Sequence, residues 1–230
     1  MKSYLLNNND ILITNRKTPL SVILFELFYN KFDFKSCLDI GCGEARIFEF
    51  INKKTKSIEY LGIDIDAGIY KVNFENKNIH KIQNNNDYKK SLKKNYDVGI
   101  FFDILEHDPS FIEPLSLTKS NINEYILFSL PNDTKFLNRI KFLFTGKMPS
   151  LDLTEISSHY YHKHHWMINV DQCEKFLKKY LDNYNLIAKY HIFNYPMSFI
   201  KRNIYLILKS FIKKDTFCDG TFLIFRKTKS

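Results

Sequence analysis

Short apolar runs alternate with amphipathic stretches along most of the chain. The runs have the length and the β-branched or aromatic content of buried strands, and the stretches between them repeat apolar residues at helical spacing. Strands are predicted at about 36–40, 58–63, 79–83, 96–102, 125–130, 186–194 and 221–225. Helices are predicted at about 20–31, 66–75 and 169–182, and another helix should follow the first strand with Ile47, Phe48 and Ile51 on its buried side. This alternation favours an α/β class protein with a doubly wound, seven-stranded, mostly parallel sheet and helices on both faces.

Two segments interrupt this rhythm. The first, residues 131–168, is far longer than the ~2–6 residues usual for a connection in an α/β unit, so we expect a lid or substrate-binding insertion. The second, residues 197–216, mixes apolar residues with Lys and Arg and is a basic amphipathic insertion. The helix before the first strand makes residues 1–35 an N-terminal helical cap. We therefore expect one domain, 1–230, with these three additions.

The first predicted strand ends in a glycine-rich turn, Gly41-Cys42-Gly43, followed by a helical stretch. Glycine tolerates positive φ and lets a ligand approach the backbone, and the helix N-terminus behind it offers N–H groups. Arg46 stands where dinucleotide-binding loops have a third glycine, which disfavours a pyrophosphate. Asp64 ends the second strand, at about the 20-residue spacing expected for a carboxylate that binds ribose hydroxyls. The pattern predicts a nucleotide-type cofactor.

The two motifs LDIGCGEA and YLGIDID resemble motifs I and II of the class I S-adenosylmethionine (SAM)-dependent methyltransferases. The resemblance implies a Rossmann-like methyltransferase fold with SAM as cofactor. It places Asp39, Gly41 and Gly43 at the methionine end of SAM and Asp64 at the ribose. The other cofactor-binding residues expected are Cys42, Ile65, Asn85 (or Asp87) at the adenine, Asp103 and Ile104.

Two polar motifs are candidates for the chemistry. Asp103, Glu106 and His107 follow the fourth strand, at the sheet edge where α/β proteins bind ligands. At spacings i, i+3 and i+4 they share one face of a helical turn. Such a set can hold a divalent cation, act as a general base, or only close the cofactor pocket and cap the next helix. The run HYYHKHHW at 159–166 is suited to metal binding or proton transfer, or to a lid without either role.

The combination of D-x-x-E-H, L-P-N and H-x-H-x-W resembles two branches of the class I enzymes: the ubiquinone-biosynthesis O-methyltransferases and the small-RNA terminal 2′-O-methyltransferases. This resemblance implies that Asp103, Glu106, His107 and His164 are catalytic residues and ligands of a divalent cation, Mg²⁺ in the RNA enzymes. Asp103 departs from the pattern, since both families have Glu there. The run SLPND…RIKFLFTGKMP is also similar to the MetW-type proteins.

Composition and charge limit the possible partners and the cellular compartment. The 34 Lys and Arg exceed the 25 Asp and Glu, and the net charge of +9 suits an anionic partner such as RNA, a phosphorylated sugar or an anionic lipid surface. Four cysteines without a C-x-x-C pair indicate reduced thiols. No apolar run reaches the ~18–20 residues of a membrane span. We expect a cytoplasmic protein.

From the sequence, the expected function is SAM-dependent methylation of an oxygen atom on a small-molecule or glycan-type acceptor, itself anionic. An RNA terminal 2′-O-methyltransferase is the alternative within this class, favoured by the positive charge. A non-catalytic MetW-like partner protein is the alternative from another class. Peripheral membrane contact through residues 199–214 is a further expectation.

Overall fold

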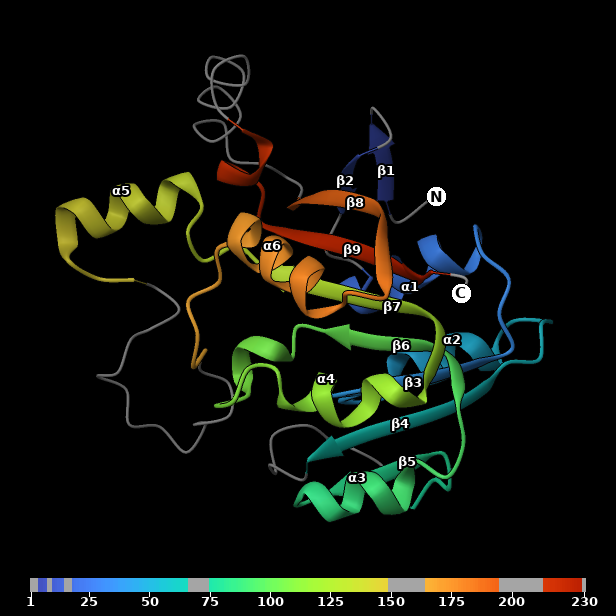
Figure 1. Cartoon of the computed structure of the whole chain (residues 1–230). Helices are drawn as coiled ribbons and strands as arrows, with labels where there is room; N and C mark the ends of the chain where they lie inside the picture. Colours follow the sequence, from blue (N-terminus) through green and yellow to red (C-terminus); the bar gives the residue numbers. More distant parts are fainter. Residues whose placement is uncertain are drawn as a thin grey trace.

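The computed structural model describes residues 4–7, 10–14, 18–65, 75–148, 164–194 and 213–228. These residues form one nine-stranded sheet in the order β1-β2-β8-β9-β7-β6-β3-β4-β5, flanked by helices (Figure 1). Its strands are β1 (Tyr4–Asn7), β2 (Ile11–Thr14), β3 (Ser36–Ile40), β4 (Glu59–Ile65), β5 (Ile79–Ile82), β6 (Tyr96–Phe102), β7 (Ile122–Pro131), β8 (Tyr184–Asn194) and β9 (Gly220–Lys227). The helices are α1 (Leu20–Tyr29), α2 (Arg46–Asn52), α3 (Asn85–Ser91), α4 (Glu113–Thr118), α5 (Phe136–Thr145) and α6 (Val170–Tyr180), with 3₁₀ turns η1 (Leu105–His107), η2 (Lys119–Asn121) and η5 (Lys214–Thr216).

The predicted fold class is confirmed. All seven predicted strands are present, and β3 to β7 pair in parallel where they are neighbours. Strand β9 is antiparallel to both β7 and β8. Strand β3 pairs with β4 on one side and with β6 on the other, so the strand order reverses there. In open α/β sheets, ligands bind at the carboxyl ends of the strands flanking such a reversal.

The sheet has nine strands rather than the predicted seven, because the N-terminal segment adds a hairpin. Strands β1 and β2 are antiparallel to each other, and β2 pairs in parallel with β8. Leu12 of β2 is completely buried in the core beneath α1. Strand β2 thus lies inside the sheet, between β1 and β8, and the helix begins at Leu20.

Helices cover both faces of the sheet because successive strand residues point to opposite sides. On one face, Phe25 and Phe28 of α1 and Ile47 of α2 pack on the strands. On the other face, Leu115 of α4 and Leu177 of α6 do so. Neighbouring residues such as Cys37 and Leu38 therefore belong to two separate hydrophobic clusters, one on each face of the sheet.

Three predicted features fall wholly or mostly outside the described residues. These are the helix over 66–75, the middle of the first insertion (149–163) and most of the second (195–212). Among the residues that are described, no helix is both long enough and apolar enough to cross a membrane.

Candidate active site

The glycine turn after β3 forms one wall of a cavity. Gly41 and Gly43 have φ angles of 73° and 52°, which glycine adopts without strain. A Cβ atom at Gly41 would collide with Cδ1 of Ile104, so a larger residue here would force the Ile104 side chain to move. The amides of Gly41 and Cys42 donate to the Ile63 carbonyl at 2.7 and 3.2 Å, which holds the turn against β4.

Two carboxylates lie beside this turn. Asp39 is buried and accepts a hydrogen bond from the Tyr60 hydroxyl at 2.8 Å. Burial raises the pKa of Asp39 to about 7, although the hydrogen bond from Tyr60 opposes the shift. Asp64 accepts from the Gly43 amide at 2.5 Å, and burial raises its pKa too. A cationic ligand next to these groups would stabilise their ionised forms.

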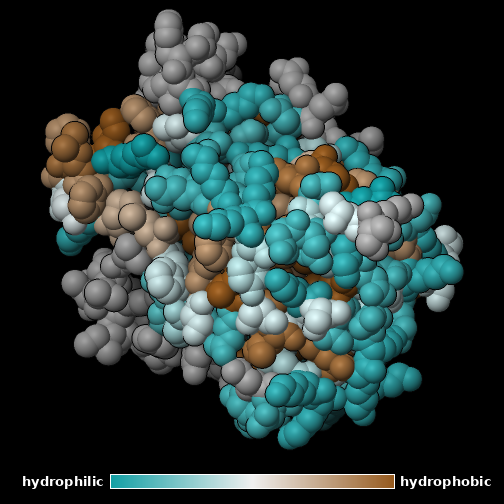
Figure 2. All heavy atoms as spheres, viewed as in Figure 1, coloured by the Kyte–Doolittle hydropathy of each residue, from teal (hydrophilic) through white to brown (hydrophobic). Residues whose placement is uncertain are grey.

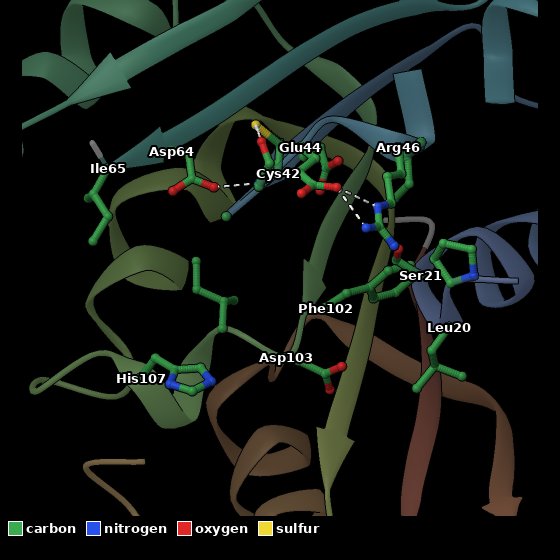
Figure 3. A pocket seen from close by; sticks show the side chains of 16 residues that line it. Leu20, Ser21, Cys42, Glu44, Arg46, Asp64, Ile65, Phe102, Asp103 and His107 are labelled. Carbon is green, nitrogen blue, oxygen red and sulfur yellow. Dashed lines mark hydrogen bonds and ion pairs between the residues drawn. The ribbon is translucent and has the colours of Figure 1, made fainter. Parts of the chain in front are cut away.

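The cavity measures about 410 Å³, which lies in the range of small-molecule sites. In Figure 3, Asp64 and the glycine turn lie on one side of it, and Asp103 and His107 lie on the other. Eight of the nine residues predicted to bind the cofactor line it: Asp39, Gly41, Cys42, Gly43, Asp64, Ile65, Asp103 and Ile104.

The ninth predicted residue, Asn85, opens α3, but its side chain is outside the described part of the chain. Its alternative, Asp87, accepts from the amides of Gln83 and Asn84 at 3.0 and 3.2 Å as part of the helix cap. Asp87 is therefore engaged in starting α3 rather than turned toward an adenine. Sequence reasoning also missed that Arg46, paired with Glu44 at 2.7 Å, lines the cavity.

Asp103 lies at the end of β6, apart from the acid/His group predicted to include it. Its φ of 50° is left-handed, and the 3₁₀ turn η1 begins only at Leu105. The expected face shared by i, i+3 and i+4 therefore does not form, and Asp103 instead accepts from the Ser129 hydroxyl at 2.8 Å. Solvent reaches Asp103 through the cavity, while protein around its other sides raises its pKa.

Glu106, His107 and His164 come together as a cluster whose potential ligand atoms all lie within 4.8 Å of one another. Glu106 is buried, and among the described residues its Oε2 atom has no hydrogen-bond partner. Its Oε1 atom is 3.9 Å from Nε2 of His107, and the rings of His107 and His164 are 4.9 Å apart. Burial, with the nearby charge of Asp103, raises the pKa of Glu106 well above its usual range.

Asp133 orients His164, and no sequence motif indicated this role. Nδ1 of His164 lies 3.0 Å from Oδ2 of Asp133, which leaves Nε2 for the cluster. The same Oδ2 accepts from the Ile168 amide at 2.8 Å. Asn132 of the predicted L-P-N motif is structural, because its amide donates to the carbonyls of Asp215 and Cys218 at 2.6 and 3.0 Å.

The end of the first insertion is fastened to η1. The His165 amide donates to the Glu106 carbonyl at 2.7 Å, and the Trp166 indole donates to the carbonyls of Asp108 and Pro109 at 3.0 and 3.2 Å. The end of the H-x-H-x-W run thus lies against the D-x-x-E-H turn, which brings His164 to Glu106 and His107 as the resemblance implied. His162, the first histidine of that pattern, is outside the described residues.

A second cavity of about 250 Å³ adjoins the first. Glu106 and His164 line only the second, whereas Leu20, Asp103 and His107 line both. A ligand in the first cavity would therefore meet a ligand in the second across these three side chains. The donor set at the second cavity, one unpartnered buried carboxylate oxygen and two imidazoles, fits a divalent cation.

A family model described as "Methyltransferase domain" matches residues 14–186. The structure is similar to a SAM dependent methyltransferase from Archaeoglobus fulgidus, with 21% identity, a TM-score of 0.57, and coverage of 90% of this chain and 93% of that one. It is also similar to the plantazolicin methyltransferase BpumL in complex with a triazolic desmethylPZN analog and SAH (21% identity, TM-score 0.56, coverage 93% and 87%). A third similar structure is the small RNA methyltransferase HEN1 (15% identity, TM-score 0.54, coverage 90% and 25%). No curated protein matches the sequence significantly.

Proposed function

Since this chain belongs to the methyltransferase domain family and is a SAM-dependent methyltransferase, we propose that it methylates an oxygen atom of an acceptor held in the second cavity. The observation that supports this most is the position of the Glu106, His107 and His164 cluster. It lies against the second cavity, which shares a wall with the cavity built on the SAM motifs. An oxygen acceptor is the kind that gains from such groups, because its proton must leave as the methyl arrives.

In this proposal the first cavity binds SAM, which supplies a methyl group on a positively charged sulfur. Asp64 accepts hydrogen bonds from the ribose hydroxyls while the Gly43 amide holds its carboxylate in place. Asp39 adds negative charge behind the glycine turn, with Tyr60 fixing its orientation. Holding the acceptor in line with the methyl group is the main contribution expected of the protein, at roughly 7–11 kcal/mol of the barrier.

The second cavity would activate the acceptor. Glu106, His107 and His164 would hold a divalent cation, with Asp133 keeping Nε2 of His164 turned toward it. A cation there supplies Lewis acidity that lowers the pKa of an acceptor hydroxyl. The two imidazoles favour Mn²⁺ or Zn²⁺ over the Mg²⁺ expected from the sequence, because Mg²⁺ prefers oxygen ligands. Asp103 lies outside this cluster, at the wall between the cavities.

The charges of the second cavity bear on the acceptor. Asp103, Glu106 and Asp219 line it. Asp219 is paired with Lys135 at 3.0 Å and burial favours the neutral form of Glu106, so an anionic acceptor would be repelled mainly by Asp103 unless a cation lies between. A hydroxyl of a glycan or of another polar small molecule does not meet this barrier. We therefore propose a hydroxylated small-molecule or glycan-type acceptor, with an anionic group only if the cation is bound.

An RNA terminal ribose is the second candidate acceptor, favoured by the net charge of +9. The likeness to HEN1 supports the fold alone. A non-catalytic MetW-like role draws no support from the site, where Glu106, His107 and His164 lie together. A cytoplasmic location also stays a proposal, supported by four free cysteines.

The test begins with the cofactor. Calorimetric titration of the wild type with SAM should show binding, which Asp64→Ala weakens and the exposed control Asp182→Ala does not. Methyl transfer from labelled SAM to a panel of hydroxylated acceptors and to RNA oligonucleotides then identifies the class. Product NMR that locates the methyl group on nitrogen or carbon would overturn the oxygen assignment. Binding of the protein to RNA alone, measured by retention at low salt, would favour the RNA terminal ribose.

A further inference from the structure

Helix α5 carries an unusual concentration of exposed apolar side chains. Four of the nine large apolar residues that are exposed in the described part of the chain lie on it, and its Leu143 and Phe144 are 77% and 80% exposed. Figure 1 shows α5 projecting from the body of the molecule, and Figure 2 shows brown side chains gathered over it. Isolated apolar residues on a surface are ordinary, but a group on one projecting helix indicates a contact surface.

The helix is firmly attached at its first turn. Phe136 packs against Phe217 with ring centroids 5.2 Å apart. The Asn138 amide donates to the Asp133 carbonyl at 2.7 Å, and Arg139 donates to the Thr134 carbonyl at 2.5 Å. The rest of the helix, from residue 139 onward, is exposed, and Gly146 ends it with a left-handed φ of 64°. The fold thus presents the second half of α5 outward.

The sequence of α5 is that of a basic amphipathic helix. Phe136, Ile140, Leu143 and Phe144 recur at i, i+4, i+7 and i+8 and form one face. Arg139 and Lys141 flank this face on its two sides, and Lys147 follows the helix. Between residues 134 and 151 the sequence contains no Asp or Glu. A partner for this surface must therefore be apolar at its centre and negatively charged around it.

We propose that α5 binds the surface of an anionic lipid bilayer, with its apolar face among the acyl chains and its cations at the phosphates. The long side chains of Arg139 and Lys141 can reach headgroups from either side of the buried face. The net charge of +9 adds attraction at longer range. Aliphatic residues such as Leu143 have no stacking partner in RNA, which makes lipid the better match.

This surface adjoins the acceptor side of the site. Asp133 receives Asn138 of α5 on its carbonyl and His164 on its carboxylate, so one residue joins the first turn of α5 to the cluster. A bilayer that holds α5 therefore lies on the side where the acceptor is proposed to bind. The membrane contact itself does not depend on which acceptor is used.

The test is flotation of the full chain with vesicles of phosphatidylcholine, with or without phosphatidylglycerol. The wild type should float with the anionic vesicles and remain unbound with the neutral ones. The double variant L143S/F144S should partition at least about tenfold more weakly. Lys141→Gln should weaken binding to anionic vesicles about fivefold. The controls Ile187→Ser on β8 and Lys93→Gln alter an exposed apolar residue and an exposed lysine elsewhere and should float as the wild type does.

Several outcomes would overturn the proposal. Wild type that ignores anionic vesicles excludes a lipid partner, and an accompanying fall in melting temperature for L143S/F144S would mean that another part of the chain covers α5. A wild-type dimer that L143S/F144S converts to a monomer, without flotation, would assign the patch to a second copy. Retention on RNA without flotation would assign it to nucleic acid. SAM titration of each variant keeps this result separate from the proposed function, because α5 does not line the cofactor cavity.

Discussion

Asp133 and His164 lie 31 residues apart in the sequence, yet Oδ2 of Asp133 is 3.0 Å from Nδ1 of His164. This contact fixes which imidazole nitrogen faces Glu106 and His107. A carboxylate that accepts a hydrogen bond from one imidazole nitrogen also makes the other nitrogen more basic and a better metal ligand.

Replacing Asp133 by Asn should therefore lower turnover by about 10- to 100-fold and leave SAM affinity unchanged. Asn keeps the size and one acceptor oxygen, so the bond from the Ile168 amide can persist. Steady-state kinetics over a range of pH, compared with calorimetric SAM binding, check this. A variant with the turnover and pH profile of the wild type would show that the contact only holds the chain together.

Asp64→Ala should weaken SAM binding by about 10- to 100-fold, because hydrogen bonds to a charged group contribute ~1.5–3 kcal/mol. The variant also leaves the Gly43 amide without its carboxylate. Calorimetry measures the effect, with Asp182→Ala as the matched exposed control. Unchanged affinity would place the ribose elsewhere.

Gly41→Ala and Gly43→Ala form a matched pair, since both positions have positive φ but only the first lacks space for a Cβ atom. Gly43→Ala should lower the free energy of unfolding by ~1–2 kcal/mol through backbone strain alone. Gly41→Ala should cost more and also lower SAM affinity, because Ile104 must shift into the cavity. Urea denaturation of both variants checks the order, and equal losses would contradict it.

The pKa of Asp39 couples stability to pH. The pKa is about 7 in the folded protein, above its ordinary value, so the folded state binds the proton more tightly than the unfolded state does. The stabilisation is complete below about pH 4 and is lost as the pH rises through about 7, and it amounts to ~4 kcal/mol. Without ligand, the free energy of unfolding should therefore fall between about pH 4 and pH 7, and Asp39→Asn should flatten this slope.

Asp39 gives SAM affinity the opposite pH dependence. Cationic SAM favours the ionised carboxylate, so its affinity should rise with pH over that interval and binding should release protons. Titrations in buffers of different ionisation enthalpy measure the protons released. Proton uptake would contradict the proposed position of SAM beside Asp39.

Glu106→Gln separates a metal ligand from a merely buried acid. Burial raises the pKa of Glu106 well above its usual range and so favours the neutral acid without a cation; the neutral and isosteric Gln should therefore leave the melting temperature nearly unchanged. Addition of Mn²⁺ should raise the melting temperature of the wild type but not that of Glu106→Gln. If Mn²⁺ stabilises neither protein, or both equally, the cation site is excluded.

Local pattern was enough to predict the seven strands of the central sheet, because each is a compact apolar run. It was also enough to predict the cavity around Gly41 and Asp64, since strand ends and glycine turns have strong local signals. The hairpin of β1 and β2 was missed because four-residue strands show too little periodicity. What identifies β2 as a strand is its pairing with β8, far along the chain.

The acceptor side was predicted less well, for related reasons. The spacing of D-x-x-E-H suggests one regular helical turn, but the left-handed φ of Asp103 depends on packing that no local motif reports. The contact of Asp133 with His164 joins two ends of a long insertion, and nothing in the residues between them indicates that closure.

That closure has a consequence for how such an enzyme can diversify. The Asp133 amide donates to the Ile168 carbonyl at 3.1 Å, and the Ile168 amide donates back to the Asp133 carboxylate at 2.8 Å. Asp133 and Ile168 thus hold the two ends of the intervening segment together, and the entropy of closing a chain segment grows only slowly with its length. We therefore expect that insertions between the end of α5 and His164 lower stability only slightly and leave SAM binding unchanged, since no described residue between Asp133 and Ile168 lines the cofactor cavity.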